Sequence, residues 1–553
     1  MNAQTVDHVA LAPLYAAVAA AIVVLLADLF APPGRRGWLL GLAGLGVTAT
    51  GVVAWWAGST PRATFCVPAE PVRAGGEAIA GCSLVADSST AVLGVAFCAV
   101  TLAVLALSAP IVRVAEVPAG EYIFLLLCSL FGSLALVGAR DLITLIVALE
   151  TLSLPLYILV GLRRTATGAS AALNYLLVSV VSTSVTLLGA ALLFAVTGEV
   201  HLRRLAAALS TVDLGTAAPL ASAGVALVLV GLVFKVAAVP FHAWAGTVYD
   251  GAPLPVAAYL STASKLGGVV AIALVTVNGL MESSAIWASV LAALAALTMT
   301  VGNLLALRQT RTVRLLAWSS VAQAGYVIAP LAGFAAVGSG GGDVSDIVGP
   351  LAATLAYVAF YVLLELGAFA AVIAVRGVRD GGTLEELRGL ATRRPWVAAA
   401  LALALAGLAG LPPGLAGLFA KVVVIRSLVD SDVLWLALVV AANAVLGLAY
   451  YVRVGAMLYD RGARAEAEHG AESAAAGAGP AATRPPVTGP AETEPAGAVL
   501  TAERPAPDDG TSERSSWPVL GTLGVVSLVA VVLGFLPQYI LWAADAAARL
   551  MLR

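Results

Sequence analysis

The chain contains very little lysine and little charge of any kind. Only three of its 30 lysine and arginine residues are lysine, and Asp, Glu, Lys and Arg together make up 11% of 553 residues. Hydrophobic residues make up 60% and the mean hydropathy is +0.97, which excludes a soluble globular protein. A net charge of −2, without any basic run beyond adjacent arginine pairs, argues against nucleic acid as a partner. The composition predicts a polytopic protein of the lipid bilayer.

Apolar runs long enough to cross the membrane recur along the whole chain. A helix crossing about 30 Å of hydrocarbon needs roughly 20 residues. Cutting the runs at charge clusters, proline and glycine predicts an all-α membrane protein with about 14 transmembrane helices. The predicted spans are 9–30, 38–58, 84–109, 121–139, 141–162, 171–197, 219–239, 253–279, 285–307, 312–335, 349–376, 395–428, 433–458 and 517–548.

The distribution of arginine predicts the orientation. The first span shows no cleavable signal peptide, because the residues before it carry Asp7 and neither Lys nor Arg. Its far end is followed by Arg35 and Arg36, and short loops on that side hold more arginine than the loops opposite. The positive-inside rule makes that side cytoplasmic. With an even number of spans, both termini are expected to be extracytoplasmic.

Two connections between the predicted spans are unusual. The loop 376–394 contains Thr383 and Glu386 in a capping-box pattern, which predicts a short helix on the membrane surface. The stretch 461–516 is rich in Ala, Gly, Pro, Glu and Thr and has almost no aromatic residues. It cannot bury enough apolar surface to offset chain entropy, so we expect a disordered cytoplasmic insert.

Cysteine is scarce as well. Cys66 and Cys82 fall in the predicted outer loop 59–83, where they either form a disulfide or remain free thiols, whereas Cys98 and Cys128 lie within predicted helices. The sequence contains no CxxC pair, metal-ligand cluster, phosphate-binding glycine loop or nucleotide fingerprint. We therefore expect no redox centre, cofactor or metal to be bound by this chain.

All three lysines, Lys235, Lys265 and Lys421, lie inside apolar stretches. Arginine stays protonated under almost all conditions, whereas a buried lysine can lose its charge because desolvation favours its neutral form. A GC-rich genome would explain few lysines, but not their placement in the membrane. Charged residues at membrane depth usually face a polar interior and mark ion pathways, so the lysines are candidate proton carriers. Snorkelling from helix ends is the alternative, and it fits Lys265 poorly.

Two acids lie at similar depth. Glu150 is near the middle of DLITLIVALETLSLPLYIL, and Glu365 lies in YVLLELGAF. Glu150 is positioned to pair with a lysine and set its proton affinity; a static ion pair that only specifies packing is the alternative. His242 is a candidate for passing protons, or a packing residue near the cytoplasmic surface.

Two of the lysines lie beside helix breaks. Lys235 precedes Pro240, and Lys421 follows Pro412 and Pro413, so the two breaks have mirrored order. Inverted repeats with broken helices are typical of transporters. The pattern indicates two half-channels, with Lys265 between them. Hydroxyl groups near Lys265 that could order water belong to Ser261, Thr262 and Ser264.

Four segments carry a family resemblance: FKVAAVPFHAWAGTVYDGAPLPVAAYLSTASK, DLITLIVALETLSLPLYIL, ALRQTRTVRLLAWSSVAQAGYVI and LAGLPPGLAGLFAKVVV. They resemble the antiporter-like membrane subunits of the bacterial proton-pumping NADH-quinone oxidoreductase (respiratory complex I, NDH-1), and VYDGAPLPV favours the subunit N type. The similarity runs from about residue 84 to 458. It implies fourteen helices with two inverted five-helix repeats. The implied parts are 1–120 (three helices), 121–279 (first repeat), 280–460 (second repeat), the insert 461–516 and the last helix in 517–553.

The resemblance also implies residue roles. Glu150 matches the family's channel glutamate, Lys235 its paired lysine, Lys265 its connecting lysine and Lys421 its distal-channel lysine. Three positions depart from the family pattern: Asn174 replaces a frequent Lys, Gln323 a common His, and Glu365 a usually uncharged residue. Glu365 either takes over part of the relay or pairs locally.

The predicted function is translocation of protons across the bacterial plasma membrane, coupled to electron transfer from NADH to quinone. As part of such a translocase, the chain would work with other complex I membrane subunits, water and lipid. The resemblance places NADH, FMN, the iron–sulfur clusters and quinone in partner subunits. One alternative is a subunit of a cation/proton antiporter complex, which co-purifying subunits would distinguish; another is a structural assembly subunit.

Overall fold

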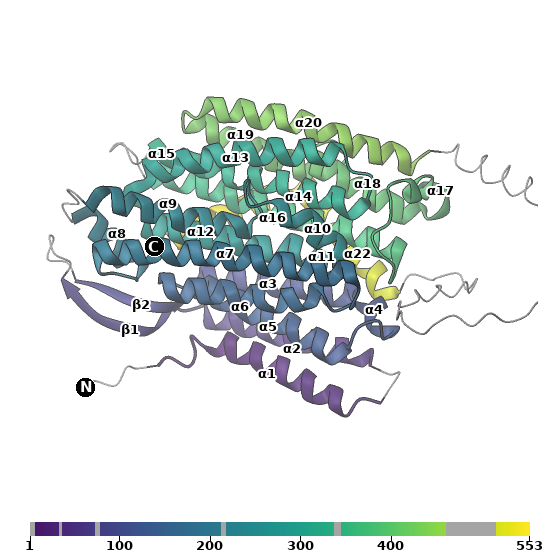
Figure 1. The fold of residues 1–553 in the computed structure, drawn as a ribbon, viewed down its shortest axis with the longest axis horizontal. Helices are drawn as coiled ribbons and strands as arrows, with labels where there is room; N and C mark the ends of the chain where they lie inside the picture. Colours follow the sequence, from purple (N-terminus) through teal and green to yellow (C-terminus); the bar gives the residue numbers. More distant parts are fainter. Residues whose placement is uncertain are drawn as a thin grey trace, which may run out of the picture.

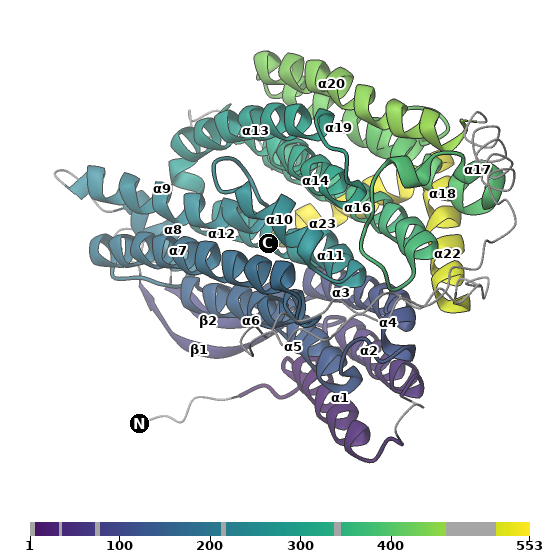
Figure 2. The same cartoon turned by 45° about the vertical axis from the view of Figure 1, so that its right-hand side comes forward.

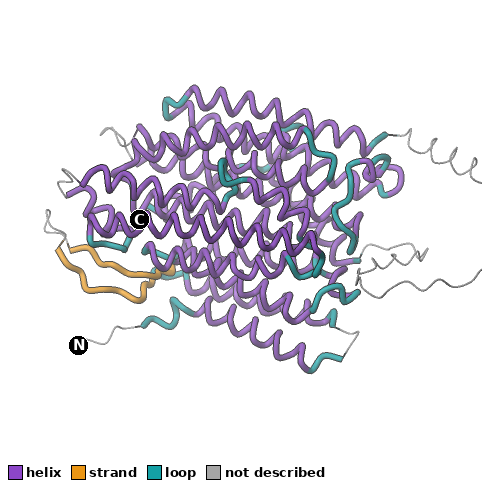
Figure 3. Tube along the Cα trace, in the orientation of Figure 1, coloured by secondary structure: helices purple, strands orange, loops and turns teal. Residues whose placement is uncertain are grey.

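Long helices lying side by side form most of the described part of the protein (Figures 1 and 3). The computed structural model describes residues 6–32, 36–71, 78–211, 217–336, 344–460 and 516–552. Within these ranges, 13 helical segments are long and apolar enough to cross a membrane. The helices in these segments are α1 (Ala12–Leu29), α2 (Trp38–Ala57), α3 (Ser88–Leu107), α5 (Ala119–Gly138), α6 (Leu142–Val160), α7 (Ala166–Thr197), α9 (Ala218–Lys235), α11 (Leu254–Tyr259) continuing through the π-helical η2 (Leu260–Ser264) into α12 (Lys265–Gly279), α13 (Ser284–Leu307), α14 (Thr312–Ile328), α16 (Val344–Arg376), α20 (Leu434–Leu458) and α22 (Trp517–Phe535).

One further crossing is made of two shorter helices. The predicted span 395–428 is divided into α18 (Pro395–Ala409) and α19 (Leu415–Asp430), with Pro412 and Pro413 between them. Each of these two helices is too short to count among the 13 segments; taken together with them, the pair matches the predicted number of about fourteen. A second interruption separates α9 from α10 (Ala243–Gly251) around Pro240. Both breaks contain prolines, which cannot donate the backbone hydrogen bond that a continuous helix needs. The predicted broken helices are therefore present at both sites.

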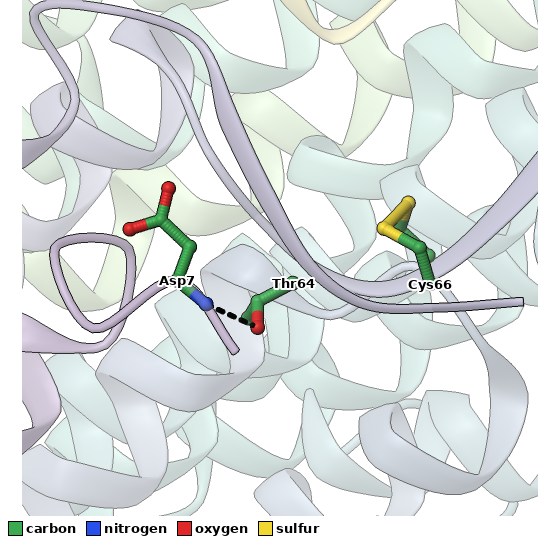
Figure 4. The surroundings of a disulfide bond; sticks show 4 residues. Asp7, Thr64 and Cys66 are labelled. Carbon is green, nitrogen blue, oxygen red and sulfur yellow. Dashed lines mark hydrogen bonds between the residues drawn. A yellow bond between two sulfur atoms is a disulfide. The ribbon is translucent and has the colours of Figure 1, made fainter. Parts of the chain in front are cut away.

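The predicted outer loop 59–83 is a β-hairpin, an element that the sequence analysis missed. Strand β1 (Arg62–Pro71) pairs antiparallel with β2 (Ala78–Ala86), and Cys66 lies directly opposite Cys82. The two cysteines form a disulfide, which settles the choice that the sequence left open (Figure 4). The backbone N–H of Asp7 donates to Thr64 Oγ1 at 3.1 Å and ties the start of the chain to this hairpin.

The predicted last span, 517–548, is too long. Helix α22 ends at Phe535, and a separate helix, α23 (Gln538–Met551), follows Pro537. A break at this point frees α23 to lie with its small residues Ala544 and Ala548 buried and its Asp545–Arg549 ion pair exposed. Met551 and Cys82 line one cavity of about 400 Å³, so both described chain ends lie at the hairpin end of the bundle. The remaining short elements are α4 (Ala109–Arg113), α8 (Leu202–Thr211), η3 (Met281–Ser283), η4 (Ala329–Gly333) and α15 (Phe334–Ala336).

The loop after α16 carries the predicted capping interaction but no regular surface helix. Glu386 Oε1 accepts hydrogen bonds from the Thr383 backbone N–H at 3.0 Å and from its hydroxyl at 3.1 Å. Only a 3₁₀ turn (Glu385–Leu387) and α17 (Leu390–Arg393) follow, because Gly389, with φ +68°, interrupts the helical path. The insert predicted at 461–516 lies outside the described residues except for Ser516.

Close packing of small residues positions the interior helices. In lipid there is little hydrophobic drive between helices, so tight contact and hydrogen bonds hold them together. Gly231 on α9 lies so close to α7 that a Cβ there would be 2.8 Å from the Ser182 carbonyl oxygen. The Ser182 hydroxyl donates to the Gly231 carbonyl oxygen at 2.7 Å. These contacts bring the polar face of α7 against the end of α9, where Lys235 lies.

Candidate functional site

Glu150 and Lys235 form a buried ion pair between α6 and the end of α9. The Lys235 ammonium donates to Glu150 Oε1 at 2.7 Å and to the hydroxyls of Ser153 and Ser179, each at 3.1 Å. The lysine side chain is 6% exposed and the glutamate side chain 22%. The Thr183 hydroxyl also donates to Glu150 Oε1, at 2.6 Å. The two residues singled out in the sequence are thus joined, with hydroxyl groups around them that can donate or accept.

Lys265 lies at the junction of η2 and α12 and is buried. Its ammonium donates to the backbone carbonyl and, at 2.8 Å, to the hydroxyl of Ser320 on α14. The hydroxyl neighbours expected from the sequence are oriented differently, since Ser261 and Thr262 donate to the Ala258 carbonyl oxygen of their own helix. A π-helical turn such as η2 often marks a functional position. Here it immediately precedes the lysine.

Lys421 lies on α19 and reaches back across the break. Its ammonium donates to the carbonyl oxygens of Leu408 at 3.0 Å and Ala409 at 2.5 Å, at the C-terminal end of α18. Helix C-terminal carbonyls carry partial negative charge and stabilise a cation. Gly410 has φ +82°, and a Cβ there would lie 3.1 Å from Lys421 Cδ, so glycine leaves the room that the lysine needs. In the described part of the chain, no carboxylate forms an ion pair with Lys421.

Glu365 lies on α16 close to Lys265. Its side chain is fully buried, and neither carboxylate oxygen has a hydrogen-bond partner among the described residues. The carboxyl group interacts electrostatically with the Lys265 ammonium. Tyr361, one turn earlier on α16, places its ring 5.8 Å from Lys265 Nζ and donates its hydroxyl to the Ser261 carbonyl oxygen at 2.7 Å. The acid that the sequence flagged as unusual thus belongs to the surroundings of the connecting lysine.

Hydroxyl groups surround the ion pair of Glu150 and Lys235. The single hydroxyl proton of Tyr157 has two acceptors within reach, Glu150 Oε2 at 3.3 Å and the Ser179 hydroxyl. The Tyr157 ring meets Tyr175 edge-on, with the ring centroids 4.7 Å apart. The hydroxyls that hydrogen-bond around the ion pair are therefore those of Ser153, Tyr157, Ser179 and Thr183.

Gln323 lies on α14, one turn after Ser319 and Ser320, and contacts a group that also contacts Lys421. Its amide nitrogen donates to the Leu408 carbonyl oxygen at 3.1 Å, the same oxygen that Lys421 contacts. The amide also contacts Tyr451, whose hydroxyl donates to Ser319, next to Ser320, at 3.0 Å. A cavity of about 10 Å³, the size of about one water molecule, lies between Gln323 and Tyr361. Helix α14 thus contributes to the surroundings of both lysines, through Ser320 at Lys265 and through Gln323 at the carbonyl oxygen that Lys421 contacts.

The remaining candidates lie apart from these contacts. His242 is half-buried beside the break after α9, where its ring contacts the Pro240 carbonyl oxygen at 3.1 Å and the edge of Trp318. Asn174 donates to the Thr247 hydroxyl at 3.0 Å and lines a cavity of about 810 Å³ that opens at the end of the bundle. Neither residue contacts a lysine ammonium in the described structure.

Sequence reasoning missed Ser320, Tyr361 and Tyr451. A signal existed for the first, because Ser319 and Ser320 interrupt the apolar run LLAWSSVAQAG, but nothing in the sequence alone paired them with Lys265. Within the described residues, no group of three His, Cys, Asp or Glu side chains is arranged to hold a metal ion.

A helical membrane bundle with two broken crossings and a buried line of lysines defines an antiporter-like membrane subunit. The chain belongs to the NADH:quinone oxidoreductase/Mrp antiporter transmembrane family, whose model matches residues 139–447. It is 57% identical over 458 residues to NADH-quinone oxidoreductase subunit N of Salinispora tropica, covering 82% of this chain and 86% of that protein. It is 44% identical to NADH-quinone oxidoreductase subunit N 2 of Streptomyces griseus, covering 87% of each chain.

Solved structures show the same fold. A chain of respiratory complex I from Thermus thermophilus is 26% identical with a TM-score of 0.67, covering 96% of this chain and 98% of that one. A chain of the Mrp complex from Dietzia is 23% identical with a TM-score of 0.71, covering 98% and 97%. The second likeness concerns the fold alone.

Proposed function

We propose that this chain is a membrane-arm subunit of a bacterial NADH-quinone oxidoreductase that translocates protons while partner subunits transfer electrons from NADH to quinone. The relatives named subunit N support the assignment to this complex over a separate antiporter complex. The observation that carries the proton role is the burial of Lys235, Lys265 and Lys421, each of which donates to buried hydroxyl or carbonyl groups. We place FMN, the iron–sulfur clusters and the quinone in the partner subunits.

The proposed route runs along the three lysines. A proton enters from the cytoplasm toward Lys235, passes through Lys265 to Lys421 and leaves on the opposite side, to which both termini are assigned. Glu150 controls the first step, because a carboxylate at 2.7 Å stabilises the ammonium form of Lys235 and its withdrawal favours release of the proton. The hydroxyls around each ammonium supply exchangeable positions between the lysines. His242 is a weaker candidate at the entrance.

Isolation of the tagged chain in mild detergent tests the assignment to the complex. We expect it to co-purify with subunits that contain flavin and iron–sulfur clusters, detectable by absorbance and mass spectrometry. Proteoliposomes of that preparation should acidify one compartment when NADH reduces quinone. Isolation with membrane subunits only, together with cation/proton exchange in vesicles, would instead identify an antiporter complex.

Glu365 is proposed to be a proton-carrying partner of Lys265. The acid is fully buried and close to the lysine, and among the described residues no hydrogen bond holds it ionised. Burying a lone charge in the membrane costs a few kcal/mol, so the acid and the lysine are expected to gain or lose charge together. We expect Glu365→Gln to lower proton translocation about fivefold, and less than loss of the lysine does. The measurement is the rate of acidification in proteoliposomes.

A second substitution separates relay from local pairing. Gln323 stands where relatives of the family commonly carry His, between the surroundings of Lys265 and Lys421. If Glu365 has taken over the step of that His, the double variant Glu365→Gln/Gln323→His should recover much of the lost rate. If the single variant Glu365→Gln translocates protons at the wild-type rate, Glu365 serves only local packing.

A further inference from the structure

A group of charged residues ties together the ends of three interior helices. We call Asp250, Arg311, Arg376 and Asp380 the ionic clamp. Asp250 lies on α10 just before α11 begins, Arg311 is the N-cap of α14, Arg376 ends α16, and Asp380 follows it. These residues belong to both halves of the chain. Figure 2 shows α10, α11, α14 and α16 next to one another.

The contacts of the clamp form a continuous chain. Arg311 Nε donates to Asp250 at 2.9 Å, and Arg311 Nη2 donates to Asp380 Oδ2 at 3.0 Å. Arg376 Nη2 donates to Asp380 Oδ1 at 2.9 Å, and Arg376 Nε donates to the Asp380 carbonyl oxygen at 2.8 Å. Arg311 thus bridges carboxylates from two helix ends. Arg314 Nε on the same helix also donates to Asp250 at 2.9 Å, and Arg376 also pairs with Glu386. Asp250 is only 10% exposed, which limits the competition from water.

Backbone contacts hold the same segments together. The Thr312 N–H donates to the Gly382 carbonyl oxygen at 3.0 Å, and the Leu384 N–H donates to the Thr310 carbonyl oxygen at 2.8 Å. Partial burial raises the pKa of Asp380, but hydrogen bonds and charge from Arg311 and Arg376 outweigh it and hold this pKa below its usual value. The carboxylate therefore remains ionised at neutral pH. Backbone and side-chain contacts thus join the same segments.

The three tied helices meet again in the interior, at the connecting lysine. The α11–α12 segment carries Lys265, α14 carries its partner Ser320, and α16 carries Tyr361 and Glu365. At 1.5 Å per residue, Ser320 lies roughly 14 Å along α14 from Arg311, and Lys265 roughly 17 Å from the start of α11. Along α16, Glu365 and Tyr361 lie roughly 17 Å and 23 Å from Arg376. A change in the relative height of the helix ends would be transmitted along stiff helices to this site. The contacts of Lys265, one of them a hydrogen bond of 2.8 Å, tolerate little displacement.

We propose that the ionic clamp, with Arg311 as its central positioning residue, sets the relative heights of α11, α14 and α16 and thereby holds Ser320 and Glu365 at Lys265. The inference rests on the proposed proton function. It assigns a role in translocation to residues that contact none of the three lysines. The Asp250 and Arg311 side chains act through the helices that they join.

Substitution of Arg311 in the assembled complex tests this role. Arg311→Gln should lower the protons moved per electron at least threefold, while NADH oxidation by a soluble artificial acceptor stays at the wild-type rate. Arg311→Lys keeps the charge but lacks the forked guanidinium that spans two carboxylates. Its number of protons moved per electron should therefore lie between the values for Arg311→Gln and wild type. Arg388→Gln is the matched control, because Arg388 is similarly exposed, at 38% against 34%, but pairs with Glu385 and Asp460. It should pump as wild type.

The outcomes separate the hypotheses. A wild-type proton ratio for Arg311→Gln, or equal losses for Arg311→Gln and Arg388→Gln, would overturn the clamp. If Arg311→Gln does not assemble, Asp380→Asn decides in its place. It removes the tie to α16 at a carboxylate that is 51% exposed, and a reduced ratio supports the clamp whereas a wild-type ratio overturns it. The proposed proton function is tested separately in the same assay by Lys265→Arg. If that variant moves as many protons per electron as wild type, the proposed function itself is wrong.

Discussion

Replacing Glu150 by glutamine should lower quinone-linked proton translocation about 30-fold in the assembled complex. Removing one partner of a buried ion pair costs about 3–5 kcal/mol of free energy. Because Glu150 is 22% exposed, we expect the protonated form of Lys235 to lose about 2 kcal/mol of stabilisation, which corresponds to about 30-fold. The ammonium of Lys235 would then have no negatively charged partner, only neutral acceptors: the hydroxyls of Ser153 and Ser179 and the amide oxygen of the new side chain. The measurement is the initial rate of acidification in proteoliposomes that contain equal amounts of complex.

Glu121→Gln is a suitable control for this substitution, because Glu121 is an exposed acid in the first turn of α5. It should translocate protons at the wild-type rate. If Glu150→Gln behaves like this control, the ion pair with Lys235 serves packing alone. If instead Glu150→Gln removes the subunit from the complex, the third alternative, a purely structural role of the buried charges, gains support.

The second large effect is expected for Lys265→Arg. Arginine keeps the positive charge but does not release its proton under working conditions. Its guanidinium can still donate to the Ser320 carbonyl and hydroxyl that Lys265 contacts, so assembly should be preserved. Translocation should fall at least tenfold, because the step between Lys235 and Lys421 requires a group that changes protonation. Turnover with NADH and quinone should fall with it if the two processes are coupled.

Lys265→Met gives the complementary control, since it removes the charge but keeps an unbranched side chain. A role in assembly predicts that the Met variant loses the complex and the Arg variant works normally. A proton-carrying role predicts that both variants assemble to some extent and that neither translocates protons. Blue native gels of the membranes, with acidification rates from the same preparations, distinguish these outcomes.

The sequence predicted the crossings and the buried lysines because both depend on local properties. Long apolar runs define membrane helices, and the prolines near Lys235 and Lys421 mark the breaks that the structure contains. The residues alone predicted that Glu150 pairs with a lysine, and the family resemblance implied that this lysine is Lys235, as the structure has it. The family resemblance added the roles that residue types alone left open.

Elements with weak local signals were missed. The hairpin around Cys66 and Cys82 lies in a short polar loop with no clear alternation, and the break at Pro537 was absorbed into a long apolar run. Ser320 and the clamp around Arg311 depend on contacts between residues far apart in the chain. Such contacts arise from helix packing, which a single sequence does not display. Tertiary contacts, rather than hydropathy, define the surroundings of each lysine.

The central claim is that Lys265 changes its protonation during turnover. The most direct measurement is the number of protons moved per NADH oxidised, determined side by side for wild-type and Lys265→Arg complexes in the same proteoliposomes. The proposed relay predicts that the Lys265→Arg complex moves fewer protons per NADH or stops turning over altogether. An assembled Lys265→Arg complex that moves as many protons per NADH as wild type, at the wild-type rate, would contradict it.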